Sequence, residues 1–123
     1  MKILLVDDNS DITTMLSKYF MMKGHDCSVS NDGHNGLSLI ENQHFDVVLL
    51  DLAMPDFSGR DILDALSRNG KVKQVNIVAL TASSVSSDDE VTLKAKGAHS
   101  ILKKPIDPDE LLNYLMQFDV NSR

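Results

Sequence analysis

The feature that most constrains the fold of this chain is a regular alternation between short apolar runs and segments of helical periodicity. Most of the apolar runs are continuous, which is typical of strands buried on both faces of a parallel sheet. The run with Cys27 and Val29 is the weakest, and we expect it at an edge of the sheet. The predicted strands are Lys2–Val6, Asp26–Ser30, Val47–Leu50, Ile77–Leu80 and Ser100–Leu102.

Cap-forming residues and glycines mark the ends of helices between these strands. Ser87 and Glu90 have the spacing of a capping box, which predicts that Ser87 caps a helix ending at Gly97. Asp107 and Pro108 open the last helix with a cap and a first-turn proline. The whole pattern predicts an α/β fold of five strand–helix units, (βα)₅. Right-handed crossovers place helices on both faces of such a doubly wound, five-stranded parallel sheet.

Composition narrows the classes of function. The formal net charge is −6, with 18 acidic and 12 basic residues. Direct contact with nucleic acid is therefore not expected, because phosphate contacts need a basic face. Membrane insertion is not expected either, because no apolar stretch approaches the ~20 residues that span a bilayer. The single cysteine, Cys27, excludes an internal disulfide and fits a reducing, cytoplasmic location.

Polar side chains stand at the carboxyl ends of the predicted strands, where open α/β sheets bind ligands. Asp7 and Asp8 follow the first strand, whereas Asp51, Thr81 and Lys104 follow the third, fourth and fifth. Clustered carboxylates repel one another, and a hard cation such as Mg²⁺ relieves that repulsion through oxygen ligands. A carboxylate can also act as a nucleophile and form an aspartyl phosphate. A metal ion, an ammonium group and a hydroxyl would then position and neutralise the phosphoryl oxygens.

These residues lie in segments that resemble the response-regulator receiver family of two-component signalling. Val6-Asp7-Asp8-Asn9 resembles its acidic pair, and the loop from Asp51 to Gly59, with Met54-Pro55, resembles its phosphoacceptor loop. Ala79-Leu80-Thr81-Ala82 and Lys104-Pro105 match its hydroxyl and lysine motifs. The resemblance covers residues 2 to about 118. It implies a flavodoxin-like fold with strand order 2-1-3-4-5 and a cis Lys104–Pro105 bond.

The resemblance also implies a role for each residue of the acidic group. Asp51 would be the phosphoacceptor. Asp8 and Asp51 would hold Mg²⁺ directly, together with the backbone carbonyl of Ala53, whereas Asp7 would act mainly through water. Read from the residues alone, Asp7 and Asp8 could instead cap the first helix.

The remaining implied roles belong to a lysine and a hydroxyl. Lys104 would pair with the phosphoryl group and Thr81 would donate a hydrogen bond to it. Lys103 is the competing basic residue, but the family places its functional lysine directly before the proline, which favours Lys104.

The sequence departs from the family at Ile101, where many members carry Tyr or Phe. A β-branched aliphatic side chain is stiff and cannot make the inward swing of an aromatic ring. We therefore expect residues 82–87 and the fourth helix to carry any conformational change, with Ile101 nearly static. Ala53 and Ser83 are small residues at positions that border the family's water path to the phosphoryl group.

The predicted function is a phosphoacceptor module, residues 1–123, without an output domain. It would take a phosphoryl group from a sensor histidine kinase or phosphotransfer protein onto Asp51. The change would reach a downstream protein through the surface of the fourth helix, fifth strand and fifth helix. Such a module is not an enzyme, apart from catalysing its own phosphorylation and dephosphorylation.

Two other classes use similar chemistry or folds. A haloacid-dehalogenase-type aspartyl-phosphate phosphatase places a second aspartate two residues after its nucleophile, but position 53 is Ala. A flavin-binding flavodoxin has a Ser/Thr-rich phosphate loop after its first strand. Here Asp7 and Asp8 would repel a phosphate at that place.

Overall fold

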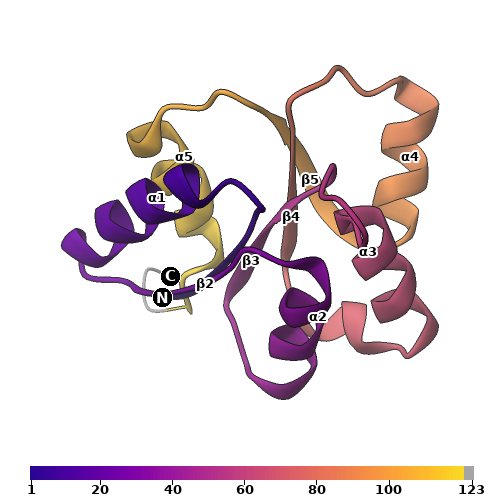
Figure 1. Ribbon diagram of the computed structural model, residues 1–123, viewed down its shortest axis with the longest axis horizontal. Helices are drawn as coiled ribbons and strands as arrows, with labels where there is room; N and C mark the ends of the chain where they lie inside the picture. The colour runs from indigo at the N-terminus through magenta and orange to yellow at the C-terminus, as the bar shows by residue number, and fades with distance from the viewer. Residues whose placement is uncertain (121–123) are drawn as a thin grey trace.

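A sheet of five parallel strands forms the centre of the computed structural model, which describes residues 1–120 (Figure 1). Its order is β2-β1-β3-β4-β5, and all neighbouring pairs are parallel. This confirms the predicted flavodoxin-like fold, including the weak strand at one edge. The strands are β1 (Lys2–Val6), β2 (Asp26–Ser30), β3 (Val47–Asp51), β4 (Ile77–Thr81) and β5 (Ala98–Lys103).

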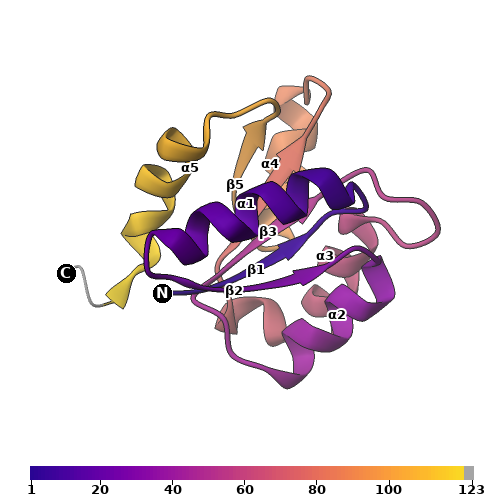
Figure 2. The same ribbon diagram turned by 60° about the vertical axis from the view of Figure 1, so that its left-hand side comes forward.

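Helices cover both faces of this sheet (Figures 1 and 2). One face carries α1 (Ser10–Met22) and α5 (Pro108–Leu115). The other carries α2 (Gly33–Asn42), α3 (Gly59–Arg68) and α4 (Ser87–Ala95). Two short 3₁₀ turns, η1 (Lys71–Gln74) and η2 (Met116–Phe118), were not predicted.

Two apolar clusters, one on each face, form the core. In β3, Val48 and Leu50 pack on the α2–α3–α4 side, whereas Val47 and Leu49 pack on the α1–α5 side. All residues of β3 and β4 are buried, which explains why their sequences are continuously apolar. Within residues 1–120, no helix combines the length and apolar character needed to cross a bilayer.

The predicted start of α4 was wrong by one residue. Ser86, not Ser87, is the N-cap, and its side chain accepts a hydrogen bond from the Asp89 backbone N–H at 3.1 Å. Sequence spacing cannot separate the two serines, because each precedes an acidic residue by three positions. The helix ends at Ala95, and Gly97 then takes a left-handed conformation with φ 118°.

Candidate functional site

Three carboxylates meet at the carboxyl edge of the sheet, as predicted from the strand ends. Asp7, Asp8 and Asp51 each offer an oxygen within 4.8 Å of the other two. The register explains this, because Val6 of β1 lies opposite Leu50 of β3. The next residues along the chain are Asp7, directly after β1, and Asp51, the last residue of β3. Asp7 and Asp51 are buried, whereas Asp8 is exposed. This set of hard oxygen donors, open to solvent at Asp8, fits Mg²⁺ with several retained waters.

Lys104 supplies the positive charge of the cluster. Its Nζ lies 2.6 Å from Asp7 Oδ2 and 3.7 Å from Asp51 Oδ2. Lys103 points elsewhere, with its Nζ 3.3 Å from Ser84 Oγ. Lys104 is therefore the lysine that reaches the acidic group, as family position indicated. The peptide bond between Lys104 and Pro105 is cis, as predicted.

Burial raises the pKa of the Asp51 carboxyl above its usual value of 3.8. The negative charge of Asp7 acts in the same direction, whereas the Ala53 backbone N–H and Lys104 lower this pKa. The Ala53 N–H donates to Asp51 Oδ1 at 3.2 Å. Ionisation of Asp51 is therefore unfavourable in this site, and a cation bound beside it would favour the ionised form.

Asp7 and Asp8 do not cap α1. Asn9 is the N-cap, and its Oδ1 accepts hydrogen bonds from the backbone N–H groups of Asp11 and Ile12. The Asn9 N–H in turn donates to Asp7 Oδ1 at 2.9 Å. Because Asn9 caps α1, the side chains of Asp7 and Asp8 are not used as its cap and lie in the acidic cluster instead.

The loop that follows Asp51 is held by close backbone packing. A Cβ at Gly59 would lie 2.3 Å from the carbonyl oxygen of Asp51, so only glycine allows α3 to start this close to β3. Ser58 and Asp61 form a reciprocal capping box at the start of α3. This box was not predicted, although its Ser-x-x-Asp spacing is a readable signal.

Thr81 is the last residue of β4 and is buried. Its Oγ1 donates to the Ser83 carbonyl and accepts from the Ser83 N–H, each at 3.1 Å. In this form the hydroxyl is engaged within its own loop. Half-buried Ile101 lies nearby and helps to line a small cavity of about 140 Å³ with Thr81 and Val85.

One supporting residue lay outside every motif of the sequence. Asn31, in the β2–α2 connection, donates from Nδ2 to the carbonyl oxygen of Asp7 at 2.7 Å. The two residues are 24 positions apart, and nothing in the sequence pattern indicated that they meet.

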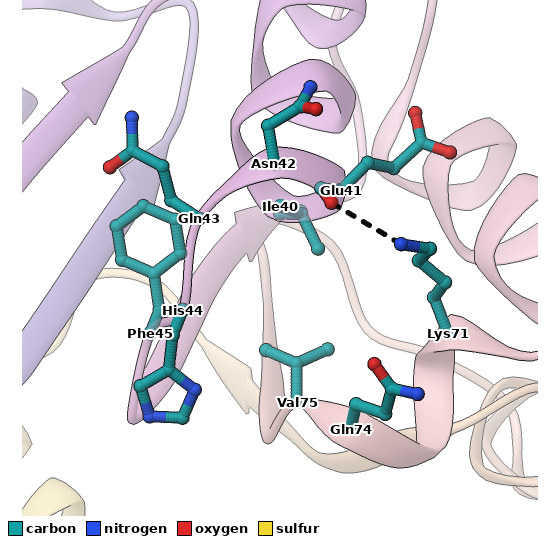
Figure 3. Close-up of a pocket in the computed structure, with 9 residues that line it drawn as sticks. All are labelled: Ile40, Glu41, Asn42, Gln43, His44, Phe45, Lys71, Gln74 and Val75. Atoms are coloured by element: carbon teal, nitrogen blue, oxygen red, sulfur yellow. Dashed lines mark hydrogen bonds between the residues drawn. The ribbon is translucent and has the colours of Figure 1, made fainter.

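A second hollow lies away from the acidic cluster (Figure 3). It has a volume of about 200 Å³ and lies before the amino ends of β3 and β4, at the opposite edge of the sheet. In this hollow Lys71 Nζ donates to the backbone carbonyl of Glu41 at 3.4 Å. It contains none of the predicted site residues, which all gather at the carboxyl edge.

A known family matches most of this chain. Residues 3–116 match the family described as the response regulator receiver domain. The transcriptional regulatory protein CpxR of Escherichia coli K12 is 36% identical over 111 residues, which are 90% of this chain and 46% of CpxR. The response regulator SaeR of Staphylococcus aureus USA300 is 32% identical over 110 residues, 89% of this chain and 46% of SaeR. The chain thus spans about half the length of these curated relatives.

Solved structures are similar over nearly the full chain. The receiver domain of the Francisella response regulator 1452 has a TM-score of 0.86 at 26% identity, covering 99% of this chain and 98% of its own. The chemotaxis protein CheY4 of Vibrio cholerae has a TM-score of 0.84 at 31% identity, covering 95% and 97%. With the family match, the strand order and the acidic edge together, the chain belongs to the response regulator receiver domain family.

Proposed function

We propose that this domain accepts a phosphoryl group on Asp51 with the help of Mg²⁺. Receiver domains are signalling domains that interact with histidine kinases and downstream effectors and bind Mg²⁺ at an acidic pocket. The observation that carries the proposal is the position of Asp51, a buried carboxylate 3.7 Å from Lys104 Nζ and grouped with Asp7 and Asp8. The ammonium group of Lys104 would neutralise charge on a phosphoryl group bound there, and the carboxylates of Asp7 and Asp8 would help to hold the metal ion.

In the proposed reaction an Asp51 carboxylate oxygen attacks the phosphorus of a phosphohistidine. A P–O bond forms as the P–N bond breaks, and the imidazole of the donor leaves with the electron pair. Asp8, Asp51 and the Ala53 carbonyl would hold Mg²⁺, which neutralises charge on the phosphoryl oxygens when bound. Lys104 would move from Asp7 to a phosphoryl oxygen, a short displacement since it already lies between the two carboxylates.

Signal output would begin at Thr81. Its hydroxyl can donate to a phosphoryl oxygen only by giving up the Ser83 carbonyl, since one O–H makes one donation. Release of Ser83 would free residues 82–86 and shift α4, while Ile101 stays in its one preferred rotamer. The altered surface, formed by α4, β5 and α5, would bind a downstream protein. Direct nucleic-acid contact by this domain is not part of the proposal, given its net charge of −6.

The test is labelling with a small phosphodonor and Mg²⁺, read by intact mass. The wild-type chain should gain one phosphoryl group, and Asp51→Asn should gain none, because an amide is not a comparable nucleophile. Asp56→Asn is the matched control, since Asp56 lies in the same loop, is exposed, and has a left-handed φ of 66° that Asn tolerates. This control should be labelled like the wild type. Equal labelling of Asp51→Asn would disprove the assignment.

A further inference from the structure

We propose that Asn31 is a positioning residue that sets the relative direction of the two carboxylates Asp7 and Asp8 for metal binding. The inference rests on the proposed function, because it takes this acidic pair as part of a Mg²⁺ site. It goes further by assigning a role to a residue from another loop, outside the acidic cluster.

The carboxamide of Asn31 uses both of its N–H donors on the β1–α1 segment. Nδ2 donates to the Asp7 carbonyl oxygen at 2.7 Å and to Thr13 Oγ1 at 2.9 Å. One side chain from the end of β2 thus ties the turn after β1 to the first turns of α1.

The Asp7 carbonyl belongs to the peptide group that joins Asp7 to Asp8. Rotation of this peptide changes ψ of Asp7 and φ of Asp8 together, and so turns the two side chains relative to each other. The preceding peptide is also held, because the Asp7 N–H donates to the Ser30 carbonyl at 3.1 Å. Ser30 and Asn31 therefore fix the backbone on both sides of Asp7. Asp8 is exposed, so its direction depends mainly on this backbone.

Thr13 completes the arrangement. It is only 2% exposed, and its hydroxyl donates to the Ser10 carbonyl at 3.2 Å while accepting from Asn31. A chain of hydrogen bonds therefore runs from Ser10 through Thr13 and Asn31 to Asp7, around the turn that carries Asp8. Mg²⁺ demands near-ideal octahedral geometry, and groups that orient ligands strongly affect metal affinity.

The capping of α2 does not explain Asn31. Asp32 is the N-cap of α2, and its side chain accepts from the Asn35 N–H at 2.9 Å. The carboxamide of Asn31 thus takes no part in capping α2 and donates to the β1–α1 turn instead.

The experiment is titration of Mg²⁺ and Ca²⁺ by calorimetry on the whole chain, with unfolding followed separately in metal-free buffer. Asn31→Ala should weaken Mg²⁺ binding by about tenfold. Ca²⁺ binding should weaken less, because Ca²⁺ tolerates irregular geometry. Thr13→Val should move Mg²⁺ affinity in the same direction, and Thr13→Ser, which keeps the hydroxyl, should restore it.

Asn35→Ala is the matched control. Asn35, in α2, also donates a hydrogen bond from its carboxamide, but to Ser30 Oγ at 2.9 Å and not to Asp7. It should leave both affinities unchanged. The inference would be overturned if Asn31→Ala bound Mg²⁺ as tightly as the wild type. It would also be overturned if Asn31→Ala and Asn35→Ala both lost affinity for Mg²⁺ and Ca²⁺ to the same extent. Absence of Mg²⁺ binding by the wild type would instead remove the proposed function itself, together with this inference.

Discussion

At the scale of single residues, Lys104 acts as an internal cation of the acidic cluster. Its Nζ lies 2.6 Å from Asp7, and its side chain is only 18% exposed, so this pair is shielded from solvent. The ammonium group offsets part of the repulsion between Asp7 and Asp51. It also lies where it would repel a divalent cation arriving at the same carboxylates, so lysine and metal compete electrostatically for Asp7.

Replacing Lys104 with methionine should therefore strengthen Mg²⁺ binding by about tenfold, which corresponds to about 1.4 kcal/mol. The same variant should be labelled more slowly by a phosphodonor, because it lacks the ammonium group near Asp51. Lys103→Met is the control, since that lysine is adjacent but reaches Ser84. Calorimetric Mg²⁺ titration measures both variants. Weaker Mg²⁺ binding by Lys104→Met would show that the lysine organises the site and does not compete with the metal.

The grouping of the acidic residues with Lys104 could be predicted from the sequence, but the hydrogen bonds that Thr81 and Asn31 make could not. Strand ends are readable from apolar runs, and parallel strands bring Asp7, Asp51 and Lys104 to one edge. The contact between Thr81 and Ser83 depends on one side-chain torsion, which no sequence pattern fixes. The Asn31 contact joins two connections that meet only through β1–β2 pairing, so neither local segment carries a sign of it.

At the scale of elements, α4 is attached to the rest of the domain differently from the other helices. Leu93 is its one buried residue. Charged pairs join it to α3. Arg60 donates two hydrogen bonds of 2.8 and 2.7 Å to Asp89, and Nζ of Lys96, the C-cap of α4, lies 2.9 Å from Asp64. Arg60 is the second residue of α3, directly after the loop that follows Asp51. The helix expected to move is thus linked by ion pairs to the element next to Asp51.

Breaking the pair between α3 and α4 should loosen α4. Both partners are partly exposed, so solvent screens the pair and its contribution is small. Arg60→Ala should then raise amide hydrogen exchange in α4 by up to about fivefold, with β1 and β3 unchanged. Lys94→Ala is the comparison, because Lys94 pairs with Glu90 inside α4. If both variants change exchange in α4 equally, the pair between the helices has no special part in holding α4.

The elements themselves were predicted well where burial dictates the pattern, as in β3 and β4. The misses lie where local rules are degenerate. The start of α4 is one, since adjacent serines fit the same cap pattern. The 3₁₀ turn Lys71–Gln74 is another, because none of its residues is buried and it leaves no apolar periodicity.

At the scale of the whole molecule, Asp51 lowers the stability of the metal-free fold. Its pKa is raised in the folded state, chiefly by burial, so the folded protein binds the proton more tightly than the unfolded chain. Stability linked to this group is therefore present at low pH and is lost as the pH rises through and above 3.8. The proposed phosphoacceptor is thus held at a cost to the fold.

Asp51→Asn should remove this cost. In buffer free of divalent cations, its free energy of unfolding at pH 7 should exceed that of the wild type by about 0.5–2 kcal/mol. The difference should shrink as the pH falls towards 3.8 and be lost below it, where a neutral carboxyl resembles the amide. Urea unfolding at a series of pH values measures it. A difference that stays constant with pH would mean that packing, not charge, accounts for the change.

Two small, exposed side chains, one after Asp51 and one after Thr81, bear on how long a phosphorylated state would last. Ala53, two residues after Asp51, and Ser83, two after Thr81, are both exposed and short. Neither can cover the carboxylate against water, and an acyl phosphate persists only while water is kept from its phosphorus. We expect the phosphorylated state to decay quickly, so that the domain would report the current supply of its donor and keep little memory of past stimulation.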